Sequence, residues 1–200
     1  PAGFHATNIV LHGLNSVLVF LLAQRLLAAG FLQFAPRPGP LVIELGAAAS
    51  ALLFAIHPLR VESVAWITER RDVLSTLFLL LAMLAYLRVF PPRSAAPVSK
   101  LAYAASIALV LLSLLSKAWG MSFFILVLVL DWYPLARLPS SPLAWLKPPA
   151  RVVLLQKLPY ALLGVIFAIQ AARAQASVAF TAIPLEQWPI SARVLQACYG

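Results

Sequence analysis

Long apolar runs, separated by short polar segments, follow one another along this chain of 200 residues. A helix of about 20 apolar residues crosses the roughly 30 Å hydrocarbon core of a bilayer. The runs therefore predict an all-α fold, a polytopic transmembrane helical bundle with about six full spans and the start of a seventh. The expected spans are residues 4–29, 41–56, 73–87, two within 101–130, 158–172, and a further one from Ser191 onward.

Breaks between these spans are marked by prolines and by one charge. Residues 31–40 hold three prolines and Arg37 and predict a loop. Pro58 discourages helical geometry at His57, so the second span stops or bends there. Residues 101–130 hold one charge, Lys117, and thirty residues fit two short spans that turn at this lysine.

The first span carries a polar seam, formed by His5, Asn8, His12 and Asn15. Their spacings of three, four and three place them on one face of a helix. Such a seam is expected to hydrogen-bond to neighbouring helices, with cavity lining as the alternative. Residues seven apart lie about 10.5 Å apart along a helix axis, so no metal site is expected.

Residues 57–72, called here the charged stretch, hold three of the six acidic and three of the fifteen basic residues. Charge beside hydrocarbon is costly and is kept mostly where it pairs, lines a wet cavity or handles a ligand. If residues 59–72 form one helix, one side could grip a polar ligand while Arg71 points away. That side holds Glu62, Trp66, Glu69, Arg70 and Asp72. The alternative is an interfacial helix whose charges meet only water and lipid headgroups.

Composition supports an integral, multi-pass membrane protein. Hydrophobic residues make up 62% of the chain, charged residues 10%, and the mean hydropathy is +0.93; soluble domains average about a quarter charged residues. The net charge of +9 lies mostly between apolar runs, where it indicates topology, so no nucleic-acid partner is expected. Cys198 is the only cysteine, which excludes an internal disulfide and a cysteine metal cluster.

Lys and Arg residues divide unequally between the two predicted membrane faces, nine against six. The richer side, expected to be cytoplasmic, holds Arg25, Arg37, Arg88, Arg93, Lys100, Arg137, Lys147, Arg151 and Lys157. The other side holds Arg60, Arg70, Arg71, Lys117, Arg173 and Arg193. The charged stretch and the Lys117 turn therefore meet at the outer face and could share one site. Asp131, about 21 Å along a helix from Lys117, is expected to be a helix-end residue at the cytoplasmic side.

Neither end of the sequence has the features of a natural terminus: there is no initiating Met, and the last residues open an apolar run. Residues 1–200 are expected to be a single transmembrane domain fragment, truncated at both ends.

Several motifs resemble a known family. They are FHATNIVLHGLN at 4–15, FAIHPLRVESVAW at 54–66, RRDVL at 70–74, LSKAWG at 115–120 and LDWYP at 130–134. Together they resemble the membrane part of tetratricopeptide-repeat (TPR) membrane proteins, which include the transmembrane O-mannosyltransferases of the GT-C glycosyltransferase superfamily. The resemblance covers essentially the whole chain, and its most specific part lies within the charged stretch.

The resemblance implies a GT-C-like fold and an enzyme that transfers a sugar, mannose, from a polyprenyl-phosphate donor to a protein hydroxyl at the non-cytoplasmic face. The partners would be the lipid bilayer, the lipid-linked donor and an acceptor protein, with no further cofactor. The location would be the bacterial inner membrane or the endoplasmic reticulum membrane. The family's acidic catalytic loop would precede Pro1 and its repeats would follow Gly200, so the fragment alone is expected to be inactive.

Such a reaction needs cations for the departing phosphate and a carboxylate near the acceptor hydroxyl. The candidates for donor phosphate binding are His57, Arg60, Arg70 and Lys117. The catalytic candidates are Glu62 and Asp72, with Glu62 expected to orient a cation or bind the sugar rather than to act as the base.

Two other functions compete with the transferase. A transporter or lipid flippase would use the polar seam and the charged stretch to line a path, but the inverted repeat typical of transporters is not visible in the sequence. A non-catalytic membrane scaffold would only anchor TPR repeats. An acidic pair upstream of this segment would favour the transferase over the scaffold.

Overall fold

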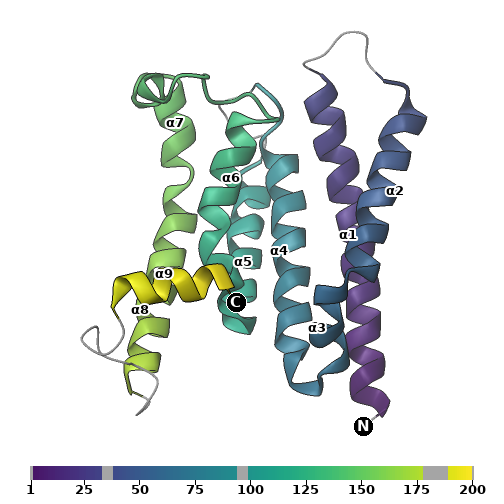
Figure 1. Ribbon diagram of the computed structural model, residues 1–200. Helices are drawn as coiled ribbons and strands as arrows, with labels where there is room; N and C mark the ends of the chain where they lie inside the picture. The colour runs from purple at the N-terminus through teal and green to yellow at the C-terminus, as the bar shows by residue number, and fades with distance from the viewer. Residues whose placement is uncertain (1, 33–37, 94–98, 178–188, 200) are drawn as a thin grey trace.

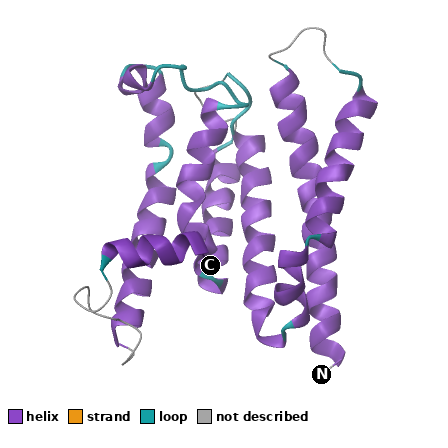
Figure 2. Cartoon of the chain, in the orientation of Figure 1, coloured by secondary structure: helices purple, strands orange, loops and turns teal. Residues whose placement is uncertain are grey.

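The computed structural model describes residues 2–32, 38–93, 99–177 and 189–199, and every regular element in these ranges is helical. The helices that run along the bundle are α1 (Ala2–Phe31), α2 (Pro40–Ile56), α4 (Arg70–Val89), α5 (Lys100–Ser116), α6 (Phe123–Trp132) and α8 (Leu158–Ser177). The other helices are α3 (Val61–Ala65), α7 (Ala150–Leu155) and α9 (Ile190–Tyr199). The predicted all-α class is confirmed (Figure 2).

The longer helices run up and down beside one another (Figure 1). α1 and α2 pair at one edge, α4 lies next to them, α5 and α6 follow, and α8 forms the other edge. The short helix α3 and the turn between α5 and α6 lie at the same end of the bundle, which is also the end where α1 begins. The expected meeting of the charged stretch and the Lys117 turn at one end is therefore present.

Within the described ranges, three helical stretches are long and apolar enough to cross a membrane: Gly3–Phe31, Arg70–Val89 and Ala150–Ser177. A fourth span forms if α2 and the segment Pro58–Ala65, which meet at a bend of 53°, are counted together. The predicted turn at Lys117 is confirmed, since α5 ends at Ser116 and a 3-10 turn over Ala118–Ser122 leads into α6. The total of six spans stays a prediction, because α5 and α6 are shorter than a full span.

The predicted seventh span corresponds to α9, whose ten residues lie across the direction of α8 rather than along it (Figure 1). The predicted loop 31–40 ends where α2 begins at Pro40, a first-turn position that suits proline. Residues 33–37 of that loop, including Arg37, lie outside the described ranges.

The main apolar core lies between α4, α5, α6 and α8. Tyr86, Phe123 and Tyr160 are fully buried there, with ring centroids 5.1–6.5 Å apart. Gly164 lets α8 approach the Ala118–Ser122 turn closely: a Cβ added at Gly164 would lie 2.7 Å from the carbonyl oxygen of Met121. Close backbone approach at small residues is typical of helix packing in membranes.

Asp131 forms a buried ionic cluster at the end of the bundle opposite α3. Its fully buried carboxylate lies 2.7 Å from Nη1 of Arg137, pairs with Lys157 and accepts a hydrogen bond of 2.7 Å from the Tyr86 hydroxyl. The sequence placed Asp131 correctly near a helix end, since α6 ends at Trp132. It did not indicate these partners, which tie α4, α6 and the α6–α8 connection together.

Candidate functional site

The charged stretch is not one helix, so the condition under which its side chains would share one face over residues 59–72 is not met. His57 is extended, a 3-10 turn covers Pro58–Arg60, and α3 covers only Val61–Ala65. Trp66 is again extended, and a second 3-10 turn, Ile67–Glu69, leads into α4. The expected single face is therefore divided among several short segments.

The polar seam of α1 stabilises these breaks. Asn8 Nδ2 donates to the carbonyl oxygens of Val64 at 3.3 Å and Trp66 at 3.1 Å, where α3 ends. Carbonyls at a helix end have no partner within the helix, and hydrocarbon offers none, so a side chain from a neighbour must supply one. The interpretation that the seam bonds to neighbouring helices is confirmed at Asn8 and extends along α1.

Two more members of the seam make the same kind of contact. Nε2 of His12 lies 3.0 Å from the carbonyl oxygen of Ala55 near the end of α2. Nδ2 of Asn15 donates to the carbonyl oxygen of Val73 in α4 at 2.9 Å. His5 lines a cavity instead, so both interpretations of the seam apply to different members. Within the described residues, no group of three or more His, Cys, Asp or Glu side chains is arranged to hold a metal ion.

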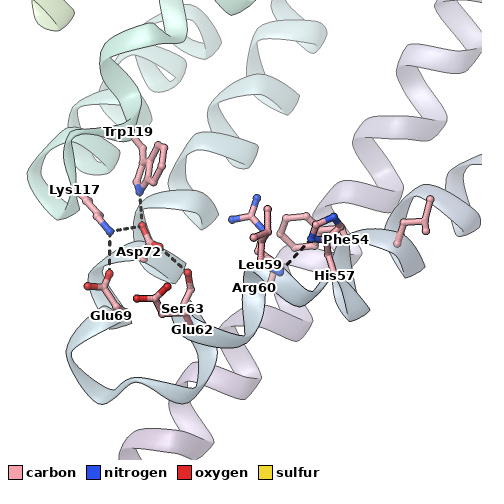
Figure 3. Close-up of a pocket in the computed structure, with 11 residues that line it drawn as sticks. Phe54, His57, Leu59, Arg60, Glu62, Ser63, Glu69, Asp72, Lys117 and Trp119 are labelled. Carbon is pink, nitrogen blue, oxygen red and sulfur yellow. Dashed lines mark hydrogen bonds and ion pairs between the residues drawn. The ribbon is translucent and has the colours of Figure 1, made fainter. Parts of the chain in front are cut away.

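A cavity of about 600 Å³, called here the polar cavity, opens where the charged stretch meets the Lys117 turn (Figure 3). Figure 3 shows its two sides: Glu62, Glu69, Asp72 and Lys117 lie on one, and Arg60, His57 and Phe54 on the other. The site therefore has a carboxylate-rich side and a side with one guanidinium, one imidazole and one aromatic ring.

Asp72 is the centre of the carboxylate-rich side. Its carboxylate accepts a hydrogen bond of 2.7 Å from Ser63 Oγ and another from the indole N–H of Trp119. Lys117 Nζ lies 2.9 Å from Asp72 Oδ1 and 2.9 Å from Glu69 Oε2. The expectation that the Lys117 turn meets the charged stretch is confirmed, and Lys117 lies between the carboxylates of Asp72 and Glu69.

The positive charge of Lys117 is already balanced by the carboxylates of Glu69 and Asp72. Partial burial alone would lower the pKa of Lys117, but the hydrogen bonds and negative charges of Glu69 and Asp72 outweigh burial and raise this pKa. The lysine is therefore charged at neutral pH and already shared between two carboxylates. Its predicted role as a phosphate ligand stays a prediction, and its observed contacts are structural.

Arg60 and Glu62 face the polar cavity without such partners. In the described part of the chain, neither side chain makes an ion pair; Arg60 stacks on Phe54, with its guanidinium carbon 4.8 Å from the ring centroid. His57 Nδ1 accepts from the backbone N–H of Leu59 at 3.3 Å, so in the neutral ring the proton lies on Nε2. The site thus offers one guanidinium, one imidazole N–H and one carboxylate to a ligand.

Arg70 and Arg71 lie apart from this group. The guanidinium carbon of Arg70 stacks 4.7 Å from the Phe4 ring centroid, on the α1 side, and Arg70 does not line the polar cavity. Its predicted role in phosphate binding is therefore without support from this geometry. Arg71 points to the surface, 63% exposed and 3.7 Å from Glu69, consistent with the expectation that it points away.

These features define a multi-pass helical membrane protein with a polar cavity at one end of its bundle. Residues of the chain are 41% identical over 91 positions to human "Protein O-mannosyl-transferase TMTC4", and 36% identical over 88 positions to fruit-fly "Protein O-mannosyl-transferase Tmtc1". A longer match, 33% over 132 positions, is to fruit-fly "Protein O-mannosyl-transferase Tmtc2". These segments are similar to protein O-mannosyl-transferases of the TMTC type, which confirms the resemblance expected from the motifs.

The matched segments are short parts of these relatives. They cover 45%, 44% and 66% of the chain but only 12%, 9% and 13% of the three relatives. No family model and no solved structure matches the chain. The similarity to these relatives is therefore one of sequence alone.

Proposed function

We propose that this chain is part of a membrane-embedded glycosyltransferase. The enzyme transfers a sugar, mannose, from a polyprenyl-phosphate donor to a protein hydroxyl at the non-cytoplasmic face of the endoplasmic reticulum or bacterial inner membrane. The polar cavity carries this proposal, because it combines a carboxylate-rich side with an available guanidinium at one end of a membrane bundle. The names of the relatives support the same reaction class.

The two sides of the cavity suit the two halves of such a reaction. The acceptor oxygen bonds to the anomeric carbon of the sugar while the bond to phosphate breaks, and the phosphate leaves with the electron pair. Arg60 and His57 stabilise its growing negative charge. Glu62 binds the sugar or orients the acceptor, and the hydroxyl proton passes to a carboxylate supplied by the longer protein.

Asp72 serves this reaction as a positioning residue. Both of its carboxylate oxygens are occupied by Ser63, Lys117 and Trp119, which leaves it poorly suited to accept a proton from the acceptor. The contacts instead hold α3, α4 and the Lys117 turn around the cavity. Of the two predicted catalytic carboxylates, Glu62 is therefore the one that this proposal places against substrate.

The proposal is tested by transfer assays on the full-length protein in lipid nanodiscs with a polyprenyl-phosphate mannose donor. Arg60→Ala removes a charge-assisted contact worth on the order of 1.5–3 kcal/mol, so transfer should fall about tenfold to a hundredfold. Glu62→Gln keeps the side-chain size and should also impair transfer. Arg71→Ala, at the exposed neighbouring position, is the matched control and should retain wild-type transfer.

Wild-type rates in both Arg60→Ala and Glu62→Gln would reject the cavity as the reaction site. An inactive wild-type protein would instead favour the scaffold or transporter function.

A further inference from the structure

The polar cavity has a second cavity beside it, of about 460 Å³, called here the apolar cavity. It lies between α1, the end of α2 and α3. Apolar lining residues include Ile9, Ile56, Val61 and Val64. His57 and Arg60 line both cavities, so these two residues form the junction between them.

The two cavities differ in chemistry. The polar cavity contains Glu62, Glu69 and Asp72, whereas no carboxylate is found among the described residues that line the apolar cavity. Its polar groups are His5, His12, His57 and Arg60, and His12 is already bonded to Ala55. The apolar cavity is therefore suited to hydrocarbon, with a cationic junction at one end.

The apolar cavity is also open to the surroundings of the bundle. Ile9, Ile56 and Val61 in its wall are 59%, 68% and 63% exposed. In a membrane protein, exposed aliphatic side chains face lipid chains, so a long hydrocarbon can enter sideways without crossing water.

Charge places an anionic group at the junction rather than within the polar cavity. The polar cavity is lined by three carboxylates and by two cations, Lys117 and Arg60. Its net charge is therefore negative when His57 is neutral. A phosphate would be repelled by Glu69 and Asp72, whose lysine is already shared. Arg60 and the Nε2–H of His57, on the other side, are the groups that a phosphate would meet favourably.

We propose that the apolar cavity holds the first isoprenoid units of the lipid donor, with the phosphate on Arg60 and His57 and the sugar in the polar cavity. The assignment rests on the proposed function for the nature of the ligand. The order along the ligand, hydrocarbon then phosphate then sugar, follows the order of apolar cavity, junction and polar cavity. This placement makes Arg60 the phosphate ligand, ahead of Arg70 and Lys117.

The first test measures binding without catalysis. Full-length protein in nanodiscs is photolabelled with a sugar-free polyprenyl phosphate that carries a diazirine in its second isoprene unit, and the labelled peptides are identified by mass spectrometry. Labels are expected within residues 5–12 and 55–65, and excess unlabelled polyprenyl phosphate should displace the probe. Labels confined to other helices, or equal displacement by phosphatidic acid, would overturn the assignment.

The matched variants are Ile9→Trp and Val10→Trp. Both residues lie in α1 with similar exposure, 59% and 61%, but only Ile9 lines the apolar cavity. Ile9→Trp should reduce labelling at least fivefold, and Val10→Trp should leave it unchanged. Ile9→Phe is the milder filling variant if the tryptophan prevents folding. Equal labelling in the filled and control variants would reject the apolar cavity as the chain site.

The second test separates this inference from the proposed function. Transfer is compared for a donor with a long polyprenyl chain and a donor with a methyl group in place of that chain. Filling the cavity with Ile9→Trp should raise KM for the long-chain donor about tenfold and leave KM for the methyl donor nearly unchanged. A cavity-dependent label without any transfer would support the lipid site and reject the transferase, whereas transfer with unchanged KM for both donors would do the reverse.

Discussion

Asp72 shows how one side chain can fix the shape of a site. It joins Ser63 of α3, Lys117 of the turn and Trp119 of the following 3-10 turn through a single carboxylate. A carboxylate that is largely buried is stabilised only when its oxygens have partners, and here three groups provide them. Its contribution at the residue scale is therefore to hold separate segments at one edge of the cavity.

Asp72→Asn should destabilise the fold because it removes the negative charge that Lys117 and the Trp119 N–H share. Hydrogen bonds to charged groups contribute roughly 1.5–3 kcal/mol, so a clear fall in the unfolding temperature is expected in detergent solution. Arg71→Ala, which removes the exposed 3.7 Å pair with Glu69, should change stability by less than about 1 kcal/mol. Equal stability of the two variants would contradict the central role of Asp72.

The pH dependence of stability should report on Lys117. Its pKa is raised in the folded state above the usual 10.5, so the folded chain binds this proton more tightly than the unfolded chain. The stabilisation is then fully present below pH 10.5 and is lost as pH rises through the higher folded-state pKa. The difference in unfolding temperature between wild type and Lys117→Met should stay constant from about pH 7 to 9 and shrink in more alkaline buffer.

At the scale of elements, the sequence predicted the long helices better than the segment that connects them. Pro58 correctly signalled the end of α2, and Lys117 correctly signalled the turn before α6. No Gly or Pro marks the break at Trp66 in the sequence. The carbonyl freed at this break is bonded by Asn8 of α1, 58 residues away. Helical periodicity describes one segment at a time and does not include such a partner.

The sequence did not predict the ionic cluster of Asp131, Arg137 and Lys157, for a related reason. Arg137 turns back so that its backbone N–H donates to the carbonyl of Asp131, six residues earlier, at 2.8 Å. Lys157, which pairs with Asp131, lies immediately before α8. The axial distance that correctly separated Asp131 from Lys117 gives no information on a connection that folds back on itself.

Gly164→Ala should test the close packing of α8. The new Cβ would lie 2.7 Å from the Met121 carbonyl oxygen, and a backbone atom has little room to move. Overpacking of this kind typically costs about 1–3 kcal/mol. Unfolding temperature and the yield of monodisperse protein in detergent measure the effect.

Gly13→Ala is the matched control in α1, where the added Cβ meets nothing within 4 Å. It should be neutral or stabilise by up to about 1 kcal/mol, because alanine favours the helix. If Gly164→Ala were as stable as Gly13→Ala, the close approach of α8 to the Ala118–Ser122 turn would not constrain the bundle.

At the scale of the whole molecule, the two ends of the bundle carry different ionic groups. One end has the polar cavity, with Glu69 and Asp72 around Lys117. The other has the buried cluster of Asp131, Arg137 and Lys157. The sequence predicted which residues share an end, because alternating spans require it, while the side that faces the cytoplasm follows from the count of Lys and Arg and remains a prediction.

Cysteine labelling in intact cells tests that orientation. In a Cys198→Ser background, a cysteine at Leu59, which is 81% exposed, should react with a membrane-impermeant thiol reagent. A cysteine at Pro92, in the connection after α4, should react only after the membrane is permeabilised. The reverse pattern would place the polar cavity on the cytoplasmic side and contradict the proposed outer-face reaction.

The segment from His57 to Glu69 depends on its neighbours for its order, which has a consequence for motion. It contains one five-residue helix and two 3-10 turns, far below the length at which a helix is stable alone. Its amide hydrogens should therefore exchange with solvent deuterium sooner than those of α4 or α5, through local opening that leaves the long helices intact. The junction of the two cavities would then be able to widen for a bulky ligand while the bundle itself stays closed.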